Sequence, residues 1–153
     1  MSGIFWIVEE EGTKPDQSVL RATKGGYPHI TLVYTGKHVA PPNLATMACD
    51  IFKWFLVPDE LQFTLPRENA KVNSFFESKT GKQRHDVLLG LDDAGVKCVQ
   101  GIRNLYELFK DEYSTQPPHV THSIHYDQEE ANRVLAALPR DPIKIRVTGF
   151  TID

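Results

Sequence analysis

The sequence predicts a single α+β domain, and three observations support this fold class. The 153 residues are enough for one domain with a sizeable core. A composition of 41% hydrophobic and 24% charged residues is that of a globular chain. Strand-like and helix-like segments follow in the order β-β-α-β-β-β-α-β-α-β, which mixes both kinds of element without strict alternation. We therefore expect one domain over residues 1–153.

Seven segments rich in β-branched and aromatic residues predict the strands. They are GIFWIVEE (3–10), HITLVYT (29–35), LQFTL (61–65), KVNSFF (71–76), DVLLGL (86–91), PHVTHSIHY (118–126) and IKIRVTGFTID (143–153). The fourth and fifth segments flank the polar run SKTGKQRH (78–85), which predicts a hairpin with a long basic tip.

Three segments with apolar residues at helical spacing predict the helices. The first covers 41–57 and opens with proline, the second covers 92–113 and opens with two aspartates, and the third covers 127–139. The third opens with the capping-box pattern Asp127…Glu130. Each half of the chain then contains a strand, an amphipathic helix and an apolar strand in that order, which suggests two related lobes.

The balance of charge argues against a protein that coats a nucleic-acid duplex. The chain has a formal net charge of −3 and a pI near 6.1. The start of the sequence, MSGIFWIVEE, does not have the pattern of a signal peptide, and no apolar run approaches the roughly 18 residues of a membrane span. Cys49 and Cys98 have no CxxC spacing and are expected to be reduced thiols. We expect a cytoplasmic monomer without membrane association or a stable protein partner.

A histidine and a threonine lie two residues apart in the strand predicted over 29–35. His29 and Thr31 project to one face, while Ile30 and Leu32 face the opposite layer, because strand side chains alternate. Such a pair alone usually marks an exposed polar face.

The same pattern returns in the second half of the chain. His119, Thr121 and Ser123 are expected on one face of their strand, with Val120 and Ile124 on the other. Both motifs follow a proline, and each opens one of the two related lobes, so the two H-x-T motifs are interpreted together. We name four of these residues the HxT quartet: His29, Thr31, His119 and Thr121.

Two imidazoles on opposite sides of a phosphodiester can share the work of an in-line displacement. A neutral histidine accepts a proton from the attacking hydroxyl or water, and a protonated histidine donates one to the leaving oxygen. Threonine hydroxyls can donate hydrogen bonds to the non-bridging phosphate oxygens. This chemistry requires no metal ion and no cofactor.

Two H-x-T motifs with this separation, each on a strand of a domain of this size, resemble the 2H phosphoesterase superfamily, which includes the LigT-like RNA cyclic phosphodiesterases. The resemblance covers nearly the whole chain, including the closing RVTGFTI strand. It implies a bilobal fold in which two antiparallel sheets line a central cleft, with helices on the outside. It also assigns the HxT quartet to catalysis. The substrate that it implies is a 2′,3′-cyclic phosphate, a 2′,5′-linked oligoadenylate or a cyclic oligonucleotide signal.

The second motif departs from the family in one position. The family usually has an aliphatic residue after the threonine, as Leu32 provides in the first motif, but the second motif has His122. The motifs do not assign which histidine is the base and which is the acid.

Other interpretations of these residues are weaker. His119, His122 and His125 would gather around a metal ion on a helix, but their β-branched neighbours favour a strand. In a strand, His119 and His125 are about 20 Å apart at about 3.3 Å per residue, too far for one zinc ion. No G-x-S-x-G elbow or glycine-rich phosphate loop is present in the sequence. Two alternatives remain: a non-catalytic nucleotide-binding or RNA-binding module on the same scaffold, and a scaffold or interaction domain in which the quartet is coincidental.

Substrate binding is expected to use aromatic platforms for a base and cations for a phosphate. The tip residues Lys82 and His85 could also reach over the cleft, and for each aromatic residue ordinary packing is an equal alternative. Because the chain is acidic overall, we expect a nucleotide or a short oligonucleotide rather than a long RNA. The substrate-binding candidates are Trp6, Tyr27, Tyr34, Lys37, Arg84 and Tyr126.

Overall fold

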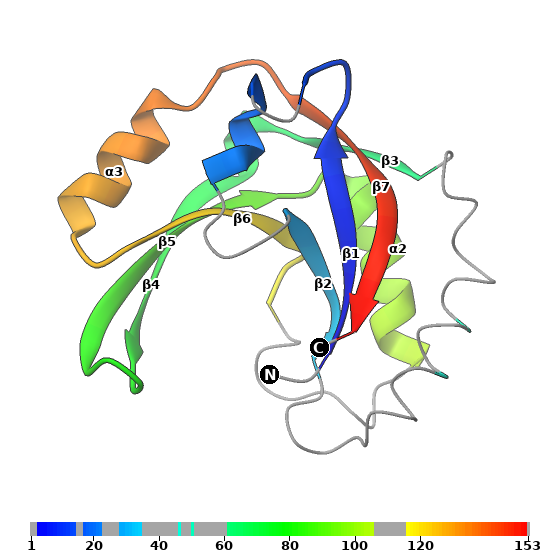
Figure 1. Cartoon of the computed structure of the whole chain (residues 1–153), viewed down its shortest axis with the longest axis horizontal. Coiled ribbons are helices and arrows are strands. Elements are labelled where there is room, and N and C mark those ends of the chain that lie inside the picture. Colours follow the sequence, from blue (N-terminus) through cyan, green and yellow to red (C-terminus); the bar gives the residue numbers. More distant parts are fainter. Residues whose placement is uncertain are drawn as a thin grey trace.

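The computed structural model describes residues 3–14, 17–22, 28–34, 46, 50, 61–105 and 116–152 (Figure 1). The strands are β1 (Gly3–Glu10), β2 (His29–Tyr34), β3 (Gln62–Leu65), β4 (Ala70–Glu77), β5 (Lys82–Gly90), β6 (His119–His125) and β7 (Ile143–Ile152). The helices are α2 (Asp93–Leu105) and α3 (Gln128–Ala137), with short 3-10 helices at Val19–Ala22 and Arg67–Asn69. The predicted α+β class and the predicted order of the strands along the chain are confirmed. Apart from Thr46 and Asp50, which are helical, the helix predicted over 41–57 lies outside the described residues, as does the end of the second predicted helix.

The strands form one seven-stranded sheet in the order β3-β7-β1-β2-β6-β5-β4, and every neighbouring pair is antiparallel. We refer to β3-β7-β1-β2 as the first half and to β6-β5-β4 as the second half. The halves are joined by β2 and β6, which share the single registered pair Ile30–Val120. Two separate sheets were expected, but this buried apolar pair joins the described strands into one. Figure 1 shows the two halves running in different directions from this joint.

One apolar core lies along one side of the sheet. It contains Ile30 and Val120 from the joint, Val99 and Ile102 from α2, and Ala131 from α3. Helix α2 packs against the first half, and α3 packs against the second. We name the opposite side the site face, because residues that flank Ile30 and Val120 must project there.

The two helices begin at the aspartates expected from the sequence. Asp92 accepts a hydrogen bond from the Gly95 backbone N–H at 2.8 Å, and Asp127 accepts one from the Glu129 N–H at 3.0 Å. Among the described residues, no helix is long and apolar enough to cross a lipid bilayer.

The β4–β5 hairpin differs from its prediction. The turn covers only residues 78–81 and closes with Gly81 at a φ of 70°, a left-handed conformation that favours glycine. Strand β5 therefore begins at Lys82, so most of the expected basic tip is strand. His85 does not reach over the site face: its ring is buried on the core side, and its Nδ1 lies 2.6 Å from Ser74 Oγ.

Candidate functional site

The joint between the two halves brings the H-x-T motifs together. Ile30 and Val120 pair in antiparallel register, and both side chains are fully buried in the core. The residues on either side of this pair therefore project to the site face. Continuing the register by one residue sets each histidine of the HxT quartet opposite the threonine of the other motif. The two histidines are then diagonal neighbours, about 7–8 Å apart, a separation that leaves room for one phosphate group.

The quartet lies between the core and the solvent. All four side chains are half-buried. The His29 ring packs edge-on against Phe5 of β1, with ring centroids 5.4 Å apart and an interplanar angle of 85°. This contact fixes the ring on the site face, since Phe5 pairs with Thr31 across the two strands.

His119 is held in a form that suits a general base. Its Nδ1 lies 2.7 Å from the Pro117 carbonyl oxygen, which accepts the Nδ1 proton of the neutral ring and leaves Nε2 with a lone pair. Burial lowers the pKa of His119, the hydrogen bond to Pro117 offsets part of this, and the positive charges of Arg103 and Lys71 lower it further. The neutral imidazole is therefore the favoured form near neutral pH.

Arg103 of α2 links the two motif strands from the core side. This buried guanidinium donates to the carbonyl oxygens of Thr31 at 2.8 Å and Leu32 at 3.0 Å on β2. It also donates to the carbonyl oxygen of Gln116, just before β6. Burial lowers the pKa of Arg103 to about 10, which still leaves the group charged at neutral pH. The sequence pattern gives no sign of this role, because a charged residue on a helix is usually solvated.

A β-bulge interrupts β6 after Thr121. On β5, Leu88 pairs with Thr121 and Val87 pairs with Ser123, so His122 is an extra residue on β6. The bulge reverses the alternation of side chains. Ser123 lies with Val87 on the core side, and the prediction that it shares a face with Thr121 is wrong.

A chain of hydrogen bonds runs beyond the bulge, beneath α3. The Ser123 hydroxyl is 3.0 Å from His122 Nδ1 and 2.7 Å from His125 Nε2. His125 Nδ1 lies 3.3 Å from the carboxylate of Glu130 on α3. Burial lowers the pKa of His122, and His125 adds to this effect. In the part of the chain that the structure describes, no group of three or more His, Cys, Asp or Glu side chains is arranged to hold a metal ion.

Arg84, a predicted phosphate ligand, is already paired with carboxylates. Its guanidinium donates to Asp86 at 2.7 and 2.9 Å and to Glu77 at 2.7 Å, and it lies 5.2 Å from the Phe75 ring centroid. Hydrogen bonds to these acids raise the pKa of Arg84 above its usual value. Since two negative charges face one positive charge, this cluster does not offer a free cation to a phosphate.

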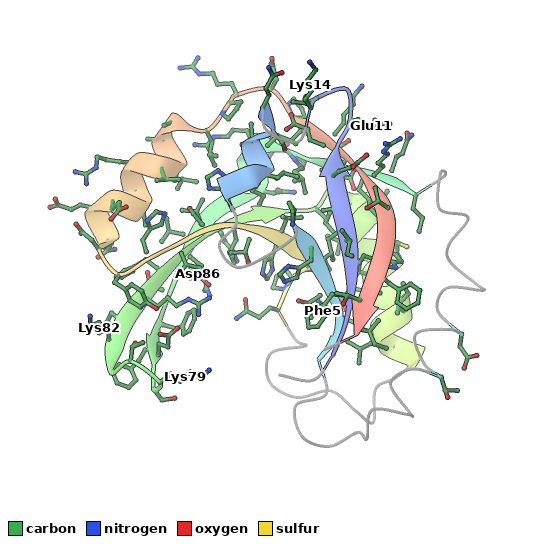
Figure 2. All side chains as sticks on the ribbon, in the orientation of Figure 1. Phe5, Glu11, Lys14, Lys79, Lys82 and Asp86 are labelled. Atoms are coloured by element: carbon green, nitrogen blue, oxygen red, sulfur yellow. The ribbon has the colours of Figure 1, made fainter. Side chains whose placement is uncertain are left out.

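Tyr126 remains a candidate platform for a base. It is 46% exposed, and its hydroxyl donates to Glu77 at 3.0 Å. The Lys82 ammonium lies 5.8 Å from the Tyr126 ring centroid. Figure 2 places Lys82 near the end of the β4–β5 hairpin, far from Phe5 on β1. A base stacked on Tyr126, which follows the end of β6, would therefore lie far from the joint at Val120 near the start of that strand.

Trp6 belongs to the core. Its side chain is 0% exposed and stacks on Phe63, with centroids 6.1 Å apart. It therefore presents no surface on which a base can stack. Three further candidates fall outside the described residues, namely Tyr27, Lys37 and the side chain of Tyr34.

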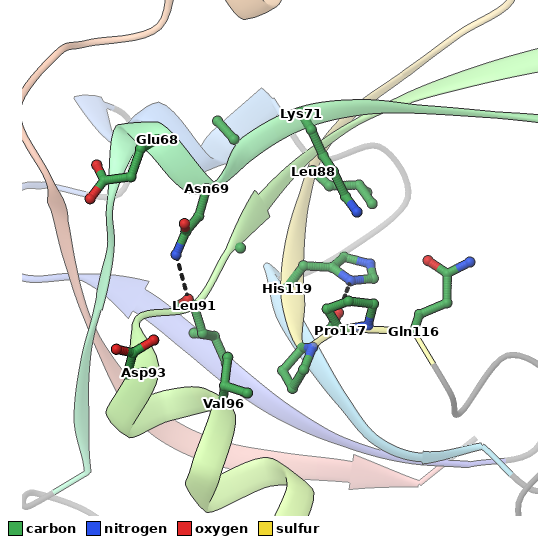
Figure 3. A pocket seen from close by; sticks show the side chains of 13 residues that line it. Glu68, Asn69, Lys71, Leu88, Leu91, Asp93, Val96, Gln116, Pro117 and His119 are labelled. Atoms are coloured by element: carbon green, nitrogen blue, oxygen red, sulfur yellow. Dashed lines mark hydrogen bonds between the residues drawn. The ribbon is translucent and has the colours of Figure 1, made fainter.

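A pocket of about 340 Å³ opens beside His119 (Figure 3). Gly90 pairs with His119 across β5 and β6, so no side chain fills the space next to the imidazole. A Cβ at Gly90 would come within 2.9 Å of the Asn69 carbonyl oxygen, which makes glycine necessary there. Of the residues that line the pocket, only His119 was predicted from the sequence as a site residue. The lining includes Glu68, Asn69, Lys71, Leu88, Leu91, Asp93, Val96, Gln116, Pro117 and Pro118.

Comparison of the chain with known protein families gives no match, and neither does comparison with curated proteins.

Proposed function

We propose that this chain is a metal-independent phosphodiesterase of the 2H phosphoesterase type, with the HxT quartet as its catalytic residues. The observation that supports this most strongly is the Ile30–Val120 pair. Continued by one residue on each side, this register would set two histidines and two threonines around one point on the site face. In this proposal the two halves of the sheet act as two lobes, and each contributes one motif to a shared phosphate site.

The two histidines have different roles in the proposed reaction. His119 Nε2 accepts a proton from the attacking water as its oxygen bonds to phosphorus, and His29 donates a proton to the oxygen of the breaking P–O bond. The threonine hydroxyls donate to the non-bridging oxygens as negative charge develops on them. After one turnover His119 holds the extra proton and His29 lacks one, and exchange with solvent restores both. The lowered pKa of His119 supports its role as the base.

The proposed substrates are a 2′,3′-cyclic phosphate, a 2′,5′-linked oligoadenylate and a cyclic oligonucleotide. All three contain a phosphodiester that two imidazoles can cleave without a metal ion. A pocket of about 340 Å³ is within the range of small-ligand sites. The net charge of −3 also favours a small ligand over a long nucleic acid.

Incubation with a panel of these three substrate classes tests the proposal. We expect turnover of at least one class, a bell-shaped pH-rate profile and full activity in EDTA. His29→Ala and His119→Ala should each lower kcat/KM by about 10³-fold, since general acid-base catalysis contributes about 10²–10⁴-fold. His125→Gln is the matched control, because it removes a histidine of β6 that lies on the core side.

The outcomes separate an enzyme from a binding module. Binding of a nucleotide without turnover would favour a non-catalytic module on this scaffold. If a substrate is cleaved but both alanine variants keep wild-type kcat/KM, the assignment of the quartet is wrong.

A further inference from the structure

Three described cations of β4 and β5 lie on the site face, and two of them have protein partners. Arg84 is paired with Glu77 and Asp86, and Lys82 lies over the Tyr126 ring. The third, Lys71 of β4, differs from both. Its side chain is exposed, and its ammonium makes no hydrogen bond or ion pair with any residue that the structure describes.

The strand register places Lys71 in line with the quartet. Lys71 pairs with Leu88 on β5, and Leu88 pairs with Thr121 on β6, so the three side chains form a row across the site face. At about 4.8 Å between strands, the Cα atoms of Lys71 and Thr121 are about 10 Å apart. The lysine stem is long and flexible enough to cover much of this distance.

The pocket connects Lys71 to His119. Both residues line it, and Figure 3 shows the Lys71 side chain extending toward the His119 ring. The ammonium is close enough to lower the pKa of His119. Glu68 and Asp93 lie on the other side of the pocket in Figure 3, where they would repel a phosphate. The electrostatics of the pocket therefore favour an anion on the side of Lys71 and His119.

The distribution of charge in the proposed reaction indicates a role for Lys71. The quartet supplies one positive charge at the start and at the end of the proposed reaction: it begins on His29 and ends on His119. Both imidazoles act at the attacking and leaving oxygens, so only neutral threonine hydroxyls face the non-bridging oxygens as these gain negative charge, and a cation there would stabilise that charge in a site without a metal ion.

We propose that Lys71 forms an anion subsite with the pocket, in which its ammonium binds a non-bridging oxygen of the scissile phosphoryl group opposite His119. This inference rests on the proposed phosphodiesterase function for the identity of the anion. Lys71 is then a further catalytic residue, which stabilises the negative charge on the non-bridging oxygens, where the quartet supplies only neutral threonine hydroxyls.

The test compares Lys71→Gln, Lys71→Arg and wild type. Lys79→Gln is the matched control, because it removes the same charge from the turn of the same hairpin, outside the pocket. Affinity for adenosine 2′-monophosphate is measured by calorimetry, and kcat/KM is measured with the substrate found in the panel. The pKa of His119 is followed by NMR.

In Lys71→Gln we expect affinity for the monophosphate to fall about tenfold and kcat/KM to fall about 10–10²-fold, because a charge-assisted hydrogen bond is lost. The pKa of His119 should rise, since the ammonium lowers it in the wild type. Lys71→Arg should restore most of the affinity, and Lys79→Gln should stay within about twofold of wild type on the same scale.

The two proposals fail in different ways. If wild type cleaves a substrate and Lys71→Gln matches it in affinity and in kcat/KM, the anion subsite is wrong and the phosphodiesterase function stands. If wild type cleaves nothing but binds the monophosphate through Lys71, the subsite stands and the phosphodiesterase function fails. If wild type neither binds nor cleaves, both proposals are overturned.

Discussion

Each half of the sheet is stabilised by a different kind of interaction. The strands of the first half bury apolar side chains, such as Ile4, Trp6 and Val8 of β1. The second half buries several polar side chains. His85 of β5 and Ser123 of β6 lie on the core side, Asp86 lies on the site face, and His122 is the extra residue of the bulge.

This difference gives the two H-x-T motifs different surroundings. The motif on β2 lies in a half that is stabilised by packing, which is insensitive to pH. The motif on β6 lies beside a network of histidines whose hydrogen bonds depend on protonation. In the proposed enzyme, the first half is the rigid frame and the second half carries the pH-sensitive residues.

The largest effect is expected from separating the two halves. Arg103→Met removes the buried guanidinium that donates to the Thr31 and Leu32 carbonyls of β2 and to Gln116 before β6. Loss of these bonds should lower the free energy of unfolding by about 3 kcal/mol, because hydrogen bonds to charged groups contribute about 1.5–3 kcal/mol each and the carbonyls lose partners. Urea denaturation measures this loss.

Asn104→Ala is the control for this substitution, since Asn104 is exposed and adjacent on α2. At temperatures where Arg103→Met is folded, this variant should also turn over a substrate from the panel more slowly than wild type. Unfolding of Arg103→Met at the wild-type urea midpoint would show that the link between the strands has little energetic weight.

A smaller effect should distinguish the helix caps of the two halves. Asp92 accepts from Gly95 of α2 and also from the backbone N–H of Thr64 on β3, at 3.2 Å, whereas Asp127 accepts from its own helix. Asp92→Ala should therefore cost about 2 kcal/mol and Asp127→Ala about 1 kcal/mol in the free energy of unfolding. Thermal and urea denaturation of the two variants would measure the difference. Equal losses would mean that the bond to β3 contributes nothing.

The sequence was sufficient to predict the parts of the fold that depend on local pattern. Strand alternation and helical spacing gave the element order, and the aspartates gave the helix starts. The contributions of Arg103 and Lys71 could not be predicted in this way. Arg103 is buried only because α2 packs across β2, and Lys71 lines up with Thr121 only through the register of three strands.

The bulge on β6 shows a second limit of the sequence pattern. One extra residue, His122, reverses the faces of all later residues in the strand, although the local composition stays strand-like. The only signal was a histidine where the resembling family has an aliphatic residue. The H-x-T motif itself was unaffected, because His119 and Thr121 lie before the bulge.

The smallest effect is expected from a modest change of pH, and it should arise in the second half. The folded-state pKa values of His119 and His122 lie below the ordinary value of 6.5. Below about pH 6.5 the unfolded chain therefore binds more protons than the folded chain, and the free energy of unfolding falls as the pH is lowered toward the folded-state pKa values. Above this window both states are neutral at these positions and the contribution is constant. Arg84 lowers the pKa of the Glu77 carboxylate below its ordinary value of 4.5. Glu77 therefore affects the free energy of unfolding only below about pH 4.5, outside the pH range in which the histidines act.

Urea denaturation between pH 7.5 and 5.5 measures this slope, and the double variant His119→Gln/His122→Gln should flatten it. Hydrogen exchange then locates the effect: amides of β5 and β6 should lose protection before those of β1 and β7 as the pH falls, because local opening releases the buried imidazoles. Equal loss of protection in both halves, or an unchanged slope in the double variant, would contradict the contrast between a packed half and a titratable half. If β5 and β6 open first, turnover must be measured together with the protection of these strands at each pH, so that opening of the network is not mistaken for protonation of the catalytic base.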